Sequence, residues 1–243
     1  MLVVEGLSKS FAGLLAVNRV SFEVRAGEIL GLIGPNGSGK STVFNLISGT
    51  FRPSAGSIRF EGQEITRLPP DRICHLGIAR TFQIPRPFRK LSILDNVTLS
   101  AYYGVDRLWS REEARRRATL ALELVGLPSD AAASVSTLGA AGLKKLELAR
   151  ALSTQPRLLL ADESLGGLDA HEMEQAAAML QRIRGELGIA IVWVEHIMAV
   201  LMKVVDRVMV LDYGEKIAEG SPASVAADPR VVEVYLGDSS PLH

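Results

Sequence analysis

The sequence has a single cysteine, Cys74, among its 243 residues. An internal disulfide and a cluster of cysteine metal ligands are therefore excluded, and this usage suits a reducing compartment. The sequence also lacks long apolar runs: stretches such as Ile189–Val194 fall far short of the roughly 20 residues that a membrane-spanning helix needs. Residues 1–11 have neither a basic start nor a long apolar run, so we expect no secretory signal. We expect a soluble chain whose tie to any membrane comes through a partner.

Neither sign of charge is in excess. The 27 Lys and Arg residues balance the 27 Asp and Glu residues. Because non-specific nucleic-acid binding depends on a basic surface, this balance argues against a nucleic-acid partner. With 47% hydrophobic residues, the chain has enough apolar material for one domain, or for one domain with a subdomain.

The first third of the chain is expected to form strands around a glycine-rich loop. Leu2–Glu5 begins one strand, and Val20–Val24 alternates clearly between apolar and polar residues. Ile29–Ile33 is a short continuous apolar run, which is typical of a strand buried on both faces. Ser41–Ser48 is predicted to be a helix, and Ser57–Phe60 is expected at a sheet edge.

Between residues 87 and 152 the pattern indicates a mainly helical insertion, which we interpret as a subdomain of a single domain spanning residues 1–243. Arg111–Val125 is a charged segment rich in Ala and Leu, and Leu143–Leu152 is a second predicted helix.

Strand patterns return after the insertion. Leu158–Ala161 and Ile189–Val194 are apolar runs, with a predicted helix, Ala170–Leu187, between them. Strand, helix and strand in this order indicate parallel pairing, and residues 207–215 resemble a late hairpin. The sequence therefore predicts an α/β fold.

Residues 34–41 carry a phosphate-binding motif. They match G-x-x-x-x-G-K-[ST] and stand between a buried strand and a helix, as this motif requires. Lys40 is predicted to reach the β- and γ-phosphates, and the Ser41 hydroxyl is predicted to bind Mg²⁺. The alternative is a chance match, which the flanking strand and helix disfavour. The predicted nucleotide contacts in this loop are Gly34, Pro35, Asn36, Gly37, Ser38, Gly39, Lys40, Ser41 and Thr42.

Polar residues also end the two later strands. Because α/β folds bind ligands at the carboxyl ends of strands, Asp162 is expected in the Mg²⁺ shell. Glu163 is expected to orient or deprotonate the attacking water. His196 follows the next strand and is expected at the γ-phosphate. The alternatives are a solvated acidic turn and an ordinary surface or core histidine.

The order of these motifs resembles the nucleotide-binding subunit of ABC transporters over essentially the whole chain. The resemblance implies an ABC ATPase fold: a P-loop NTPase core with an N-terminal antiparallel β part and a helical insertion. It also implies ATP hydrolysis coupled to transmembrane transport, with ATP and Mg²⁺ as cofactors. The matching residues are Phe11, Gly34–Ser41, Gln83, Leu138–Gly142, Asp162–Glu163, Leu168–Asp169 and His196.

The resemblance assigns a role to each of these positions. Phe11 would stack on adenine, and Asp169 would act across a dimer. Gln83 would join the Mg²⁺ and water network and transmit movement to the helical insertion. The implied catalytic residues are Glu163, His196, Gln83 and Lys40, and the implied metal ligands are Ser41, Gln83 and Asp162.

Several segments resemble one subgroup, the ATPase subunits of branched-chain amino-acid importers. The implied partners are a second ATPase subunit, integral membrane permease subunits and, indirectly, a substrate-binding protein, with the chain on the cytoplasmic side of the inner membrane. The segments are Ala79–Gln83, Leu146–Leu152, Glu195–Met198, Asp206–Val208, Val210–Gly214, Ile217–Gly220 and Val234–Gly237.

Other functions stay open at this point. Another transporter branch, such as urea or amide import or lipopolysaccharide export, is one alternative. A non-transport ABC ATPase and a purely structural nucleotide-binding module are the others. The transported substrate itself cannot be predicted, because permease subunits and a binding protein would set it.

The signature segment departs from the family pattern, which is usually L-S-G-G-Q or L-S-Y-G-Q. The family's serine, which bonds the γ-phosphate of the opposite nucleotide, is Gly139 here, and a lost charge-assisted hydrogen bond costs about 1.5–3 kcal/mol. A helix beginning near Gly142 would still direct N–H groups at the phosphate. Since a signature serves the partner's P-loop, we hypothesise a heterodimer with an ATPase whose signature is intact; a homodimer stays open. The aligned residues are Leu138, Gly139, Ala140, Ala141 and Gly142.

Overall fold

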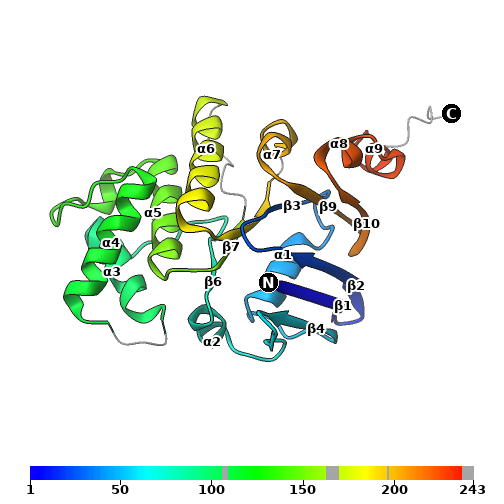
Figure 1. Cartoon of the computed structure of the whole chain (residues 1–243), viewed down its shortest axis with the longest axis horizontal. Helices are drawn as coiled ribbons and strands as arrows, with labels where there is room; N and C mark the ends of the chain where they lie inside the picture. Colours follow the sequence, from blue (N-terminus) through cyan, green and yellow to red (C-terminus); the bar gives the residue numbers. More distant parts are fainter. Residues whose placement is uncertain (106–108, 163–169, 196, 237–243) are drawn as a thin grey trace.

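The computed structural model describes residues 1–105, 109–162, 170–195 and 197–236. Two sheets with helices packed around them make up the molecule (Figure 1). The strands are β1 (Leu2–Phe11), β2 (Leu14–Val24), β3 (Ile29–Ile33), β4 (Ala55–Phe60), β5 (Gln63–Glu64), β6 (Ile78–Arg80), β7 (Leu158–Asp162), β8 (Ala190–Val194), β9 (Arg207–Asp212) and β10 (Glu215–Gly220). The helices are α1 (Lys40–Ile47), α2 (Pro70–His75), α3 (Ile93–Tyr103), α4 (Arg111–Val125), α5 (Ala140–Ser153), α6 (Ala170–Leu187), α7 (Met198–Val204), α8 (Pro222–Ala226) and α9 (Pro229–Leu236), with a 3₁₀ turn at Val135–Thr137.

The two sheets differ in strand direction. The four-stranded sheet has the order β2-β1-β4-β5 and is antiparallel throughout. The six-stranded sheet has the order β10-β9-β3-β8-β7-β6, and only its β9–β10 pair is antiparallel. This arrangement confirms the predicted α/β fold with an N-terminal antiparallel part.

Strand β3 lies at the centre of the core, as its continuous apolar sequence predicts. Successive side chains on a strand point to opposite faces of its sheet. Ile29 and Ile33 accordingly pack into the cluster that contains apolar residues of α5 and α6. Leu30 and Leu32 pack into the cluster with α1 and the four-stranded sheet. Both faces of the large sheet are thereby covered, which fixes the position of the loop that follows β3.

Helices α3, α4 and α5 occupy the segment for which the sequence predicts a helical insertion, and they lie together at one end of the molecule (Figure 1). The start of α4 is capped by the Ser110 side chain, which accepts a 3.1 Å hydrogen bond from the Glu113 backbone N–H. Its end is capped by Gly126, at a left-handed φ of 68°. The bounds of α4 and α6 agree with the sequence prediction. The treatment of this segment as a subdomain stays a prediction.

One local expectation is confirmed and another is wrong. Helix α5 begins at Ala140 with Gly139 as its N-cap, which agrees with the expected helix start near Gly142. Ser57–Phe60 belongs to β4, which pairs with β1 on one side and β5 on the other, so it is not an edge strand. The second prediction failed because the local sequence of a strand does not show how many strands pair with it.

Within the described ranges, none of the helices combines the length and the apolar character that a membrane crossing requires.

Candidate functional site

Three neighbouring parallel strands end at one edge of the large sheet. The order β3-β8-β7 places the loop after Ile33 beside the end of β8 and the end of β7. The residues at these ends are the loop 34–41, buried Glu195 and buried Asp162. Open α/β sheets bind their ligands at such an edge. The parallel topology therefore brings together the two motifs that the sequence places 121 positions apart, at residues 41 and 162.

The loop 34–41 is held in a tight curve by its own lysine. The Lys40 ammonium donates to the backbone oxygens of Gly34 at 2.7 Å and Pro35 at 2.9 Å. Gly34 has a φ of 152°, and a Cβ at this position would lie 2.1 Å from the backbone oxygen of Leu211. Only glycine therefore fits where the chain leaves β3 and passes the end of β9.

The loop has features that fit a bound phosphate group. The Ser38 hydroxyl is buried and has no hydrogen-bond partner among the described residues. Helix α1 begins at Lys40 after Gly39, and no side chain caps its first turn. Backbone N–H groups at a helix start favour anions, and a buried hydroxyl favours a polar partner. The donor set is therefore suited to the phosphates of a nucleotide.

Two of the predicted Mg²⁺ ligands lie at this edge of the sheet: the buried carboxylate of Asp162 ends β7, and the exposed Ser41 stands at the start of α1. In the part of the chain that the structure describes, no group of three or more His, Cys, Asp or Glu side chains is placed so that it could hold a metal ion. Mg²⁺ usually keeps several waters and is bound through one or two carboxylates together with substrate phosphates. A single carboxylate, that of Asp162, beside a phosphate-binding loop is consistent with this way of binding Mg²⁺.

Arg80, at the end of β6, is a residue of the site that the sequence did not predict. Its Nη2 donates to Oδ2 of Asp162 at 2.8 Å, and its Nη1 donates to Oδ1 of Asn45 on α1 at 2.6 Å. The backbone N–H of Asp162 donates to the Thr81 hydroxyl at 3.1 Å. No local pattern marks Arg80, because its partners lie 35 and 82 positions away.

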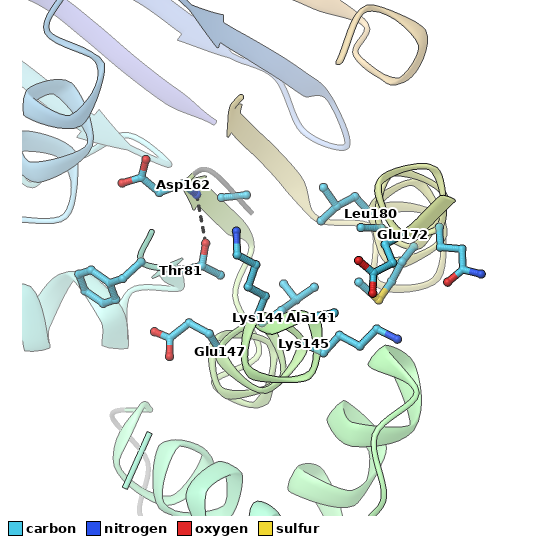
Figure 2. Close-up of a pocket in the computed structure, with 14 residues that line it drawn as sticks. Thr81, Ala141, Lys144, Lys145, Glu147, Asp162, Glu172 and Leu180 are labelled. Carbon is cyan, nitrogen blue, oxygen red and sulfur yellow. Dashed lines mark hydrogen bonds between the residues drawn. The ribbon is translucent and has the colours of Figure 1, made fainter. Parts of the chain in front are cut away.

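A cavity of about 130 Å³ adjoins Asp162. Figure 2 shows it between α5 and α6, with Thr81 and Asp162 joined by a hydrogen bond at one end. Lys144 extends from α5 toward that end, and Glu172 enters from α6. Residues of α5 and α6 thus line the same cavity as Asp162 at the end of β7.

The aromatic residue predicted to stack on adenine is half-exposed. Phe11 has 38% of its surface accessible, and its ring meets Phe51 edge-on at 5.2 Å. The Lys9 ammonium lies 4.9 Å from the centroid of the Phe11 ring. Phe51 and Lys9 were not predicted. The alternation of a lysine with Phe11 on β1 is a sequence signal for Lys9, whereas Phe51 lies outside β1 and has no such signal.

The remaining predicted residues fall into two groups. Gln83 is exposed and lies on the segment that follows β6, and Gly139 is exposed at the start of α5. A Cβ at Gly139 would meet no heavy atom within 4 Å. Glu163, Leu168, Asp169 and His196 lie outside the described residues.

Helix α9 also touches the phosphate loop. Burial raises the pKa of Tyr235 to about 12, and a hydrogen bond between its hydroxyl and the backbone N–H of Gly34 opposes that rise. The C-terminal helix thus contacts the first residue of the loop.

Comparison with known protein families adds an independent line of evidence. The sequence profile described as "ABC transporter" matches residues 17–166, more than half of the chain. The chain belongs to the ABC transporter family. A second profile, described as "Branched-chain amino acid ATP-binding cassette transporter", matches residues 215–240.

Curated members of the ABC transporter family match this chain over almost its whole length. The high-affinity branched-chain amino acid transport ATP-binding protein BraF of Pseudomonas aeruginosa is 34% identical, with 98% of each chain covered. The corresponding protein LivG of Escherichia coli is 35% identical, also with 98% of each chain covered.

Solved ABC cassettes have the same fold. One in its ADP conformation has a TM-score of 0.87 and 30% identity, and covers 98% of this chain and 99% of its own. A dimeric cassette in a post-hydrolysis state, bound to ADP and Pi, has a TM-score of 0.82 and 26% identity, with 91% and 99% covered. The predicted ABC ATPase fold, nucleotide binding and ATP hydrolysis are confirmed; the individual site residues stay predictions.

Proposed function

We propose that this ABC ATPase powers an importer of branched-chain or related amino acids. The observation that carries the proposal is similarity over 98% of the chain to BraF and LivG, which are named for branched-chain amino acid transport. The match of residues 215–240 to a branched-chain amino acid profile supports the same substrate class.

We assign the nucleotide to the loop 34–42 and to Phe11. Lys40 and the N–H groups at the start of α1 would hold the phosphates, and Phe11 would stack on the base. Ser41, Asp162 and Gln83 would hold Mg²⁺, which supplies charge neutralisation at the β- and γ-phosphates when bound. Glu163 would orient the attacking water, and His196 would contact the γ-phosphate.

We assign the second half of the ATP site to another ATPase subunit. Asp169 and the signature Leu138–Gly142 would act on the partner's nucleotide, and Gly139 lacks the serine hydroxyl that serves this purpose elsewhere in the family. A heterodimer would pair this chain's intact P-loop with a partner's intact signature. A homodimer would use two weakened signatures.

A cleft beside Gln83 is our assignment for the permease contact. It is lined from the core by Ile73, Ala79 and Arg80, and from the helical segment by Ser100, Arg150 and Ala151. Phe82 also lines it, and the apolar side chains of Phe82, Ile84 and Phe88, on the segment around Gln83, are exposed. Exposed apolar surface of this kind marks interaction sites. A cytoplasmic helix of a permease would cover it, which would hold the chain at the cytoplasmic side of the membrane.

ATP hydrolysis by the purified chain, wild type beside Glu163→Gln, tests the enzymatic part of the proposal. Mg²⁺-dependent hydrolysis that disappears in the variant, while ATP binding persists, would support the role of Glu163 in a homodimer. ATP binding without turnover in the wild type would support the heterodimer. A wild-type chain that binds no nucleotide would contradict the assignment of the site.

Uptake into proteoliposomes tests the transport part. The chain would be purified with its permease subunits and binding protein, and leucine, isoleucine and valine would be compared with urea and an aromatic acid. We expect ATP-dependent uptake of the branched-chain amino acids that Glu163→Gln abolishes. Uptake of urea or aromatic acids alone would overturn the proposed substrate class.

A further inference from the structure

We propose that Arg80 is a positioning residue for the metal shell: it holds the carboxylate of Asp162 in one orientation and ties it to the P-loop helix and to the Gln83 segment. This inference rests on the proposed nucleotide site, in which Asp162 belongs to the Mg²⁺ shell.

The Arg80 guanidinium connects three elements. On one side, Nη2 donates to Oδ2 of Asp162 at 2.8 Å, at the end of β7. On the other side, Nη1 donates to Oδ1 of Asn45 at 2.6 Å and lies 3.4 Å from the Ser48 hydroxyl, both at the far end of α1. The planar fork of arginine gives these donors fixed directions, which a lysine ammonium cannot reproduce. The side chain of Asp162 is thereby set relative to the helix that begins with Lys40.

Two aromatic rings hold the guanidinium in place. The Phe44 ring of α1 lies 5.6 Å from the guanidinium carbon, and the Phe82 ring lies 5.1 Å from it. Phe82 immediately precedes Gln83. A displacement of the Gln83 segment would therefore act on Arg80 and, through Arg80, on Asp162.

Asp162 is also fixed from its backbone. Its N–H donates to the Thr81 hydroxyl, and Thr81, the neighbour of Arg80, donates its own N–H to the Leu160 backbone oxygen at 3.0 Å. Arg80 engages Oδ2, and Oδ1 is the oxygen that we assign to the metal shell. Outer contacts that orient a ligand in this way are part of a metal site.

Stability alone does not account for this pair. The side chains of Arg80 and Asp162 are only 9% and 6% exposed. Removing two charges from water costs about as much as their attraction returns, so a buried ion pair is weak evidence for stabilisation. Because Arg80 also bonds Asn45 of the helix that follows the phosphate loop, orientation of the Asp162 carboxylate explains the pair better than stabilisation of the fold does.

The test compares metal binding in Arg80→Met and Arg80→Lys with wild type. Mn²⁺ binding to the complex of the chain with ADP would be measured by electron paramagnetic resonance, and fluorescent ADP binding would be measured in EDTA. Arg207→Met is the matched control, because Arg207 forms a similar, largely buried pair with Glu28, at 2.6 Å, between β9 and the residue preceding β3.

We expect Arg80→Met to weaken Mn²⁺ binding about 10- to 100-fold, the usual effect of losing an outer contact. ADP binding in EDTA should be unchanged, because Lys40 and its loop are intact. The Mn²⁺ affinity of Arg80→Lys should lie between those of wild type and Arg80→Met, because lysine keeps the positive charge but lacks the planar guanidinium fork. If Arg80→Met does not fold, Arg80→Lys alone must still weaken Mn²⁺ binding.

Mn²⁺ binding that is unchanged or tighter in the folded Arg80 variants would overturn the proposal, as would equal weakening in Arg207→Met. A wild-type chain that binds ADP but no Mn²⁺ would contradict the proposed metal site instead, and one that binds neither would contradict the nucleotide site.

Discussion

At the residue scale, the conformation of the phosphate loop depends on its glycine residues. Gly34 and Gly37 both have positive φ angles, 152° and 81°. They differ in their surroundings: a Cβ on Gly34 would lie 2.1 Å from the Leu211 backbone oxygen and 2.5 Å from the Ser38 hydroxyl, whereas one on Gly37 would meet nothing within 4 Å. An alanine at Gly37 would therefore meet only backbone strain, whereas an alanine at Gly34 would meet backbone strain and a steric clash.

We predict that Gly34→Ala destabilises the chain much more than Gly37→Ala does. Gly37→Ala should lower the free energy of unfolding by roughly 1–2 kcal/mol, the cost of a left-handed backbone at a residue with a Cβ. Gly34→Ala adds a collision with backbone of β9, which cannot rotate away, so the loop must shift and ADP binding should be lost. Urea unfolding and ADP titration of both variants measure these effects; equal unfolding free energies would contradict the crowding at Gly34.

At the element scale, α9 connects the C-terminal part of the described chain to the phosphate loop. Its Tyr235 hydroxyl shares a hydrogen bond with the Gly34 N–H, and 40% of the residue's surface is exposed. Partial burial raises the pKa of Tyr235 to about 12 from an ordinary value of 10.0. A raised pKa means that the folded state favours the neutral phenol. The stabilisation is complete below about pH 10 and is lost as the pH rises toward about 12.

We therefore expect wild type to lose stability between about pH 10 and pH 12 more steeply than Tyr235→Phe, which has no phenol to ionise. Thermal unfolding at a series of pH values measures the difference. Tyr213→Phe is the control, because Tyr213 is 88% exposed. A steeper loss in Tyr235→Phe than in wild type would mean that the phenol is not buried as described.

The elements that sequence predicted well are those whose own residues decide their structure. Ile29–Ile33, Arg111–Val125 and Ala170–Leu187 have the predicted bounds. Strand β3 is apolar on both faces, and α4 carries its own serine and glycine caps. Strand β6 was missed, because its three residues are too short for a periodic pattern and form a strand only by pairing with β7.

At the scale of the whole molecule, our proposal makes the signature segment Leu138–Gly142 decide whether a homodimer or a heterodimer hydrolyses ATP. Gly139 caps α5 without a side-chain hydrogen bond, has an ordinary φ of −75° and has open space where a Cβ would lie. A serine would therefore fit without displacing other atoms and would place a hydroxyl at the start of the helix.

We predict that Gly139→Ser raises ATP turnover by the chain alone about 10- to 100-fold, which corresponds to the about 1.5–3 kcal/mol of one charge-assisted hydrogen bond. Steady-state hydrolysis as a function of protein concentration is the measurement, since the effect requires a dimer. Gly185→Ser on α6 is the control, because a Cβ there also meets nothing within 4 Å. Rapid turnover in wild type that Gly139→Ser leaves unchanged would rule out a weakened signature and, with it, our reason for a heterodimer.

The features that depend on consecutive residues could be predicted from the order of residues along the chain. A loop of eight residues must place its glycines, lysine and serine consecutively, so residues 34–41 could be recognised without any fold. Asp162 was predictable because an apolar run that ends in an acid marks the end of a buried strand. The α/β class and the family resemblance were predictable for the same reason, because they follow from the order of short motifs along the chain.

The contacts between residues far apart in the sequence became apparent only from the fold. Arg80 reaches Asp162 because β6 pairs with β7 in parallel, and it reaches Asn45 because α1 packs beside that edge of the sheet. Tyr235 meets Gly34 across about 200 positions of sequence. Such contacts follow from how the sheets and helices pack around a common core, and packing depends on all the buried surfaces at once, so no local pattern records it.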